Sequence, residues 1–99
     1  MATKLNESEI SARLASHPGW AASGSSAGGD SSISQTFKFK DHITALGFVV
    51  RVGMVAEVLN HHPDLRIVYN RVEITLSTHD AGGVTENDFQ LAEKIDGLG

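Results

Sequence analysis

The sequence contains no cysteine and only two prolines among its 99 residues. Because there is no thiol, disulfide bonds, thiolate nucleophiles and cysteine-ligated zinc or iron–sulfur sites are all excluded. Aromatic residues are scarce too, since four Phe, one Trp and one Tyr make up 6% of the chain. The core must therefore be built mainly from Val, Ile, Leu and Ala side chains.

Basic residues are also in the minority, with eight Lys and Arg against twelve Asp and Glu and a net charge of −4. This charge is a poor match to nucleic acid or to an anionic membrane, so we expect neither as a partner. The beginning of the chain is polar and shows no targeting segment, which favours a cytoplasmic location. The longest apolar stretch, residues 43–59, contains Arg51 and Glu57, and we expect it to fall short of a membrane span.

A chain of this length has room for a single domain over residues 1–99. Near its start, Asn6 followed by Glu9 predicts the capping box of a short helix. Trp20 is expected to open a weak strand, and the Gly- and Ser-rich residues 21–32 are expected to form a flexible loop. Alternation of apolar and polar side chains then predicts a second strand over residues 33–39.

A longer helix is predicted to begin at Asp41 and to be ended by Pro63. It carries more apolar side chains than one buried face needs, so we expect one of its sides to contact another subunit. Two apolar sets occupy it: a stripe at spacings of three and four (Ile43, Leu46, Val50, Met54 and Val58), and a second group that widens it (Phe48, Val52, Val55 and Leu59).

The last part of the chain predicts two strands, residues 65–69 and 71–78, which form a hairpin with His79 at its end. Thr85, with Asp88 three residues later, predicts another capping box and a final helix. The order of elements is α-β-β-α-β-β-α. It predicts an α+β fold, a two-layer sandwich in which three helices cover one face of a four-stranded antiparallel sheet.

Histidine is the residue type that carries chemistry here, because three of the five histidines lie between positions 61 and 79. His61 and His62 follow the long helix, and His79 ends the last strand. Imidazole has an ordinary pKa of about 6.5, so each ring can give or take a proton near neutral pH. We expect the three rings to line one cleft, with Glu57 and Asp88 as carboxylates that orient them.

Less specific interpretations stay open for these residues. A His-His-Pro sequence at a helix end is also typical of a plain polar cap, and His79 by itself would be a solvated hairpin residue. Asp88 fits a capping acid equally well. His17 and His42 have no partner pattern, and we expect them to be structural.

A zinc site is another alternative, since catalytic zinc takes three protein ligands and three histidines with Glu57 would supply them. However, neighbouring residues on a helix point about 100° apart, so His61 and His62 do not share a face. The sequence also lacks a His-Glu-x-x-His pattern. Metal binding is therefore the weaker interpretation.

Together, the spacing of these residues resembles the signature of the pterin-4a-carbinolamine dehydratases, E-x3-H-H-P-x5-Y-x9-H-x8-D. Every position is filled, by Glu57, His61, His62, Pro63, Tyr69, His79 and Asp88. Shorter stretches that resemble the family lie around it (Gly19-Trp20, Phe37–Asp41, Tyr69–Val72, Leu76–His79, Gly83–Asp88 and Leu91-Ala92). The resemblance covers nearly the whole chain apart from the Gly- and Ser-rich segment.

The resemblance implies removal of water from 4a-hydroxytetrahydropterin to give quinonoid dihydropterin, which recycles tetrahydrobiopterin after aromatic amino-acid hydroxylation. It implies that His61 and His79 are the acid/base pair, that no cofactor or metal takes part, and that His62 holds and polarises the pterin. Glu57 and Asp88 would orient these rings. Further residues at substrate-contacting positions of the family are Asn60, Ser77, Thr78 and Asp80, although many relatives carry an acidic residue in place of Asn60.

The family resemblance also implies the predicted order of elements, with sheets joined across a homodimer and helices that pack dimers into a homotetramer. A pterin-dependent hydroxylase would be a functional partner. Two other classes of function stay open. One is a non-catalytic pterin-binding or dimerisation module that keeps the pterin site, and the other is a metal-dependent enzyme that uses the same histidines.

Overall fold

The computed structural model describes residues 3–24 and 30–98 of the chain. Its helices and strands follow the predicted order α-β-β-α-β-β-α, with one short 3-10 helix, η1, before the last helix. In chain order they are α1 (Glu7–Leu14), β1 (Ala21–Gly24), β2 (Ser31–Lys38), α2 (His42–Leu59), β3 (Asp64–Val68), β4 (Arg71–Leu76), η1 (His79–Ala81) and α3 (Glu86–Asp96). The predicted fold class is confirmed.

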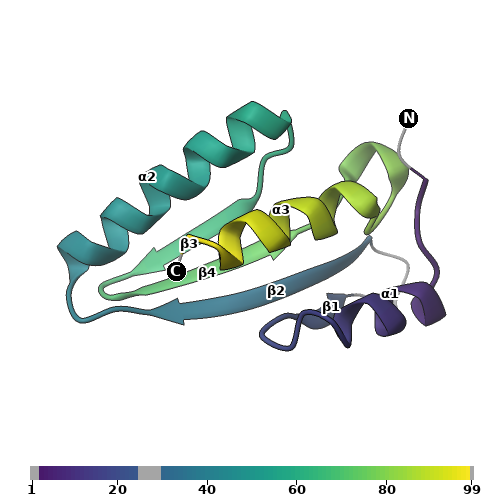
Figure 1. Ribbon diagram of the computed structural model, residues 1–99, viewed down its shortest axis with the longest axis horizontal. Helices are drawn as coiled ribbons and strands as arrows, with labels where there is room; N and C mark the ends of the chain where they lie inside the picture. The colour runs from purple at the N-terminus through teal and green to yellow at the C-terminus, as the bar shows by residue number, and fades with distance from the viewer. Residues whose placement is uncertain (1–2, 25–29, 99) are drawn as a thin grey trace.

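The four strands form one antiparallel sheet in the order β1-β2-β4-β3. Figure 1 shows α2 and α3 lying against one face of this sheet, with α1 beside β1. Arg13 ties α1 to α3, because its guanidinium donates to Glu86 at 2.8 Å and lies 4.8 Å from the centre of the Phe89 ring. The core lies between the layers, and the sheet contributes the alternate residues that face the helices, such as Val72 and Ile74.

The predicted helix starts are confirmed. Both capping boxes are present, at Asn6 for α1 and at Thr85 for α3. Asp41 caps α2, where its carboxylate accepts from the N–H of Thr44 at 2.8 Å. The hydrogen bonds from Thr44 lower the pKa of Asp41 below its ordinary value, because they stabilise the charged form of the carboxylate.

The expectation of a flexible loop over residues 21–32 is wrong at both of its ends. Ala21–Gly24 form β1, and β2 already begins at Ser31. These strands pair through backbone hydrogen bonds, which do not require the large side chains that the segment lacks. The middle of the expected loop, residues 25–29, lies outside the described residues. Trp20 precedes β1, and only 4% of it is exposed.

The two apolar sets of α2 face opposite ways. Phe48 and Val52, from the second set, are fully buried against the sheet. The regular stripe is the exposed one, and the large exposed apolar residues of α2, called here the α2 stripe, are Ile43 (81%), Leu46 (41%), Val50 (61%), Met54 (65%) and Val58 (84%). A Cβ added at Gly47 or Gly53 would meet no atom within 4 Å, so both glycines lie on open surface.

α2 is also long and apolar enough to cross a membrane by length and composition alone, with 18 residues and a mean hydropathy of 1.6. The expectation that this stretch falls short of a span is therefore wrong in that respect. Its inner face, with Ala45 and Phe48, packs into the core of the domain. The apolar composition thus serves the core on one side and leaves an exposed apolar surface on the other.

The end of α2 is set by Asn60, three residues before Pro63. Asn60 has a left-handed conformation with φ of 53°. Its N–H donates to the carbonyl of Glu57 at 3.1 Å, and the N–H of His61 donates to that of Ala56 at 3.0 Å. This is a Schellman motif, in which Gly or Asn is favoured because a Cβ is strained in the left-handed region. The turn leads directly into the histidine pair.

Asn60→Val should lower the free energy of unfolding by about 1–2 kcal/mol, because a β-branched side chain fits the left-handed region poorly. Asn60→Gly is the matched control and should be as stable as the wild type or more so, since glycine has no Cβ. Urea unfolding followed by circular dichroism measures both. An equal loss of stability in the two variants would contradict this explanation of the helix end.

Candidate functional site

His61 and Asp88 form a buried pair that joins α2 to α3. Nε2 of His61 lies 2.5 Å from Oδ1 of Asp88, and the two side chains are 13% and 0% exposed. His61 directly follows the turn that ends α2, while Asp88 lies in the first turn of α3. The sequence predicts both as site residues, but only the packing of α2 beside α3 makes them partners.

The second carboxylate oxygen of Asp88 accepts two further hydrogen bonds. The hydroxyl of Thr78 and the backbone N–H of Thr85 each donate to Oδ2 at 2.8 Å. The two threonine hydroxyls lie 2.7 Å from each other. The capping interpretation of Asp88 is therefore confirmed, and the same carboxylate also contacts a histidine. Two donors and the imidazole of His61 thus satisfy a carboxylate that has no exposed surface.

The chain beyond β4 is shaped so that Thr78 reaches Asp88. Thr78 and Gly83 exchange backbone hydrogen bonds of 2.9 and 3.2 Å, which close a turn around η1. Gly83 is needed there because a Cβ would collide with the hydroxyl of Ser31. The hydroxyl of Ser77 donates to the carbonyl of Ser31 at 2.7 Å. The hydroxyls of Ser77 and Thr78 are thus both engaged within the protein.

His62 has a carboxylate partner of its own. Its Nε2 lies 2.8 Å from Oε1 of Glu57, and the side chains are 58% and 80% exposed. Exposed ion pairs stabilise proteins by no more than about 1 kcal/mol. Glu57 therefore holds the ring of His62 only weakly, and the ring stays accessible to a solute.

His79 does not end the last strand as predicted. β4 stops at Leu76, and His79 begins η1, whose turn is completed by Gly82 at φ of 80°. The imidazole is 96% exposed, and its Nδ1 lies 3.5 Å from Oδ2 of Asp30. Sequence reasoning missed Asp30 because it lies in the Gly- and Ser-rich segment, without any spacing that relates it to a histidine. Asp80, the next residue in η1, is exposed.

The remaining two histidines make contacts of a structural kind, as expected. Nδ1 of His42 lies 2.6 Å from the carbonyl oxygen of Tyr69, which connects the start of α2 to the β3–β4 turn. The ring of His17 packs 5.6 Å from that of Phe89. Neither of these two contacts involves Asp88.

The structure thus gathers part of the predicted site. His61, Asp88 and Thr78 form one hydrogen-bonded group, and His79 is the next residue after Thr78. His62 is directed to a separate carboxylate. Within residues 3–24 and 30–98, no group of three or more His, Asp or Glu side chains is arranged to hold a metal ion.

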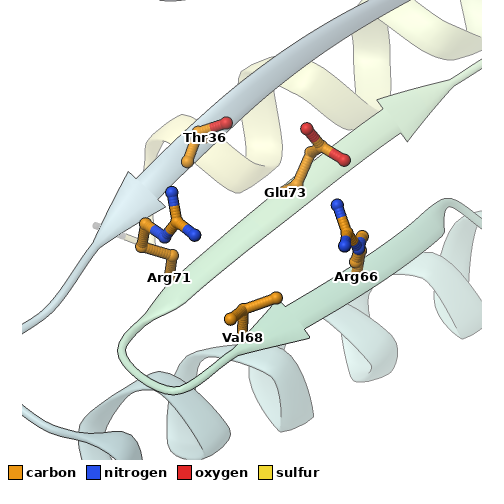
Figure 2. A pocket seen from close by; sticks show the side chains of 5 residues that line it. All are labelled: Thr36, Arg66, Val68, Arg71 and Glu73. Atoms are coloured by element: carbon orange, nitrogen blue, oxygen red, sulfur yellow. The ribbon is translucent and has the colours of Figure 1, made fainter.

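Two hollows have no histidine in their lining. The smaller, of about 60 Å³, opens on the face of the sheet that carries no helix (Figure 2), and it is lined by Thr36, Arg66, Val68, Arg71 and Glu73. The larger, of about 310 Å³, is lined by four apolar residues of α2 and by Lys94 of α3. Neither is lined by a predicted site residue.

Comparison with known proteins points to one family. The family profile described as Pterin 4 alpha carbinolamine dehydratase matches residues 3–98. A protein of Picosynechococcus sp. that bears the name "Putative pterin-4-alpha-carbinolamine dehydratase" is 45% identical over 98 residues, which cover 99% of this chain and 100% of that protein.

Solved structures agree with this match. A crystal structure from Brucella melitensis, described as a transcriptional coactivator/pterin dehydratase, has a TM-score of 0.87 at 41% identity and covers 97% of this chain and 98% of its own. A pterin dehydratase-like protein, described as a RuBisCO assembly factor in the alpha-carboxysome, has a TM-score of 0.65 at 21% identity over 80% of this chain and 87% of its own. This second likeness concerns the fold alone. Because the profile and the relatives match along nearly the full length, the chain belongs to the pterin-4a-carbinolamine dehydratase family.

Proposed function

We propose that this protein removes water from a 4a-hydroxytetrahydropterin to give quinonoid dihydropterin. The family provides the class of reaction. The observation that carries the proposal is the buried pair of His61 and Asp88, which Thr78 connects to the turn that bears His79. We further propose that the protein acts in the cytoplasm, where a pterin-dependent hydroxylase would supply its substrate for tetrahydrobiopterin recycling.

The dehydration requires two proton transfers. The bond between C4a and its hydroxyl breaks, the leaving hydroxyl takes up one proton, and a ring nitrogen loses another. The protons balance and no electrons are transferred, so the reaction needs no oxidant or reductant. Imidazole side chains can carry out both transfers near neutral pH. His61 and His79 would form this acid/base pair.

The neighbouring residues would hold the substrate. His62 has an exposed ring that can stack on or hydrogen-bond to a pterin and polarise it. Asn60 and Asp80 are exposed and would contact the substrate through their side chains. Ser77 and Thr78 would contribute backbone groups, because their hydroxyls already bond within the protein.

The direct test is stopped-flow measurement of the dehydration of 4a-hydroxytetrahydropterin with and without the protein. Acceleration in proportion to protein concentration is expected. The same experiment separates the enzyme from a non-catalytic pterin-binding module. Such a module would bind the pterin, as followed by fluorescence, and leave the rate of water loss at the uncatalysed value.

His61→Ala and His79→Ala are each expected to lower the rate about 10²–10⁴-fold, because each removes a proton-transfer group. His79 is almost fully exposed, so its variant should remain folded, and circular dichroism checks this. His17→Ala is the control, because that ring packs on Phe89 and should leave the rate near that of the wild type. An unchanged rate in folded His79→Ala protein would rule out the acid/base assignment.

Dehydration should persist after dialysis against a strong chelator, because imidazoles alone move the protons. The chelated protein is assayed by stopped flow, and its metal content is measured by mass spectrometry. A rate that is lost in chelator and returns with added Zn²⁺ would favour the metal-dependent alternative instead.

We also propose that the protein forms homo-oligomers through the α2 stripe. Its five side chains are between 41% and 84% exposed, and such apolar surface is typical of an interface. Gly47 and Gly53 lie open on the same helix and would allow another helix to approach closely. A chain of this size buries only about two-thirds of its unfolded surface, so burial against a second copy would add stability. Both a homodimer and a homotetramer fit these observations.

Met54→Glu should reduce the oligomer to a smaller species, because it places a charge within the α2 stripe, between Val50 and Val58. Arg51→Glu is the matched control: it introduces the same side chain at an exposed position of α2 outside the stripe. Light scattering coupled to size-exclusion chromatography gives the masses. A wild-type monomer, or equal masses for the wild type and Met54→Glu, would refute this interface.

A further inference from the structure

In the chain of hydrogen bonds around Asp88, the donor and the acceptor of each bond can be assigned by counting the available protons. Thr78 has a single hydroxyl proton, which it donates to Oδ2 of Asp88 at 2.8 Å. The 2.7 Å contact between the hydroxyls of Thr78 and Thr85 must therefore be donated by Thr85. The backbone N–H of Thr85 is a second donor to Oδ2, also at 2.8 Å. Thr85 and Asp88 are both fully buried, so solvent does not compete for these bonds.

This arrangement assigns Oδ1 to His61. A carboxylate only accepts hydrogen bonds, so the 2.5 Å contact requires a proton on Nε2 of His61. A neutral imidazole carries one ring proton. Nδ1 of His61 is therefore unprotonated in the neutral ring and is the nitrogen that can accept a proton.

We infer that Thr78 and Thr85 are positioning residues that hold Asp88 so that His61 is kept in the Nε2–H form and works through Nδ1. The catalytic part of this inference rests on the proposed function, whereas the tautomer does not. In the reaction, the N–H bond of the pterin ring breaks and its proton passes to Nδ1. The imidazolium so formed keeps its Nε2–H bond to Asp88, whose negative charge stabilises it. His79 then gives a proton to the leaving hydroxyl, which departs as water.

Asp88→Asn tests the direction of the chain, because the two side chains have the same shape. The Thr78 hydroxyl and the Thr85 N–H are donors, so they select the amide oxygen for the place of Oδ2. The amide NH₂ must then face His61. Since NH₂ is itself a donor, Nε2 of His61 has to accept, and the ring proton moves to Nδ1. The variant should therefore reverse the tautomer of His61.

Nitrogen-15 NMR of the ring nitrogens reports the tautomer directly, in buffer alkaline enough that the imidazoles are neutral. The wild type should carry the His61 proton on Nε2, and Asp88→Asn should carry it on Nδ1 and lose about 10²–10⁴-fold in rate. Glu57→Gln is the matched control for the spectrum, since it makes the same acid-to-amide change beside His62. It should leave the ring proton of His61 on Nε2, as in the wild type. A wild-type proton on Nδ1, or an Nε2 proton retained in folded Asp88→Asn, would overturn the inference. The wild-type spectrum decides the question even where the variant does not fold.

Thr85 is tested by kinetics. Thr85→Val removes the hydroxyl and should lower kcat with little change in KM, because the side chain is buried and touches no substrate. Thr85→Ser keeps the hydroxyl and should restore kcat. Asn6→Ala removes the cap of α1 and controls for lost stability alone, so an equal loss of kcat there would contradict a positioning role. A wild type that shows the expected tautomer but does not accelerate dehydration would overturn the proposed function and support the tautomer assignment.

Discussion

One buried carboxylate holds together the end of this protein that carries the candidate active site. Asp88 has no exposed surface and makes three hydrogen bonds, with the N-terminus of its own helix α3, with the chain that leaves β4, and with His61 just beyond the turn that ends α2. A charge buried this deeply is tolerated only when donors surround it. The ends of three elements are therefore fixed relative to one another by a polar requirement as well as by apolar packing. Because one of these partners is His61, the same polar requirement also positions a residue of the candidate active site.

The three histidines of the site differ in how firmly they are held. His61 is mostly buried and bound to a fully buried carboxylate with two further hydrogen bonds, whereas His62 and His79 are largely exposed and meet carboxylates at the surface. The hydrogen bond to Asp88 gives the ring of His61 a defined orientation. Exposed rings can adjust to a substrate that arrives from solvent. This combination suits a reaction in which one proton is removed at a defined place and another is delivered to a leaving group.

Local features could be predicted from the sequence because they depend on residues a few positions apart. The capping boxes at Asn6 and Thr85 and the hairpin of β3 and β4 are of this kind. The sequence places a strand start at Trp20 but wrongly assigns Ala21–Gly24 to a loop, since a strand of small residues pairs through its backbone and shows no side-chain pattern. Periodicity also revealed two apolar sets on α2, but it does not say which one meets the sheet. The regular stripe proved to be the exposed one, because the opposite face carries the small, fully buried side chains of Ala45 and Ala56, which let the helix approach the strands.

The sequence by itself determined the family signature, from Glu57 to Asp88, and the order of helices and strands. Both depend only on residue types and on short spacings along the chain. Only the tertiary structure decided which carboxylate meets which histidine. Asp88 meets His61 because α3 packs beside the end of α2, which leaves Glu57 to its near neighbour His62. Such pairings depend on how α2, η1 and α3 pack together over the sheet. Residues far apart in the chain come within hydrogen-bonding distance only when the core assembles.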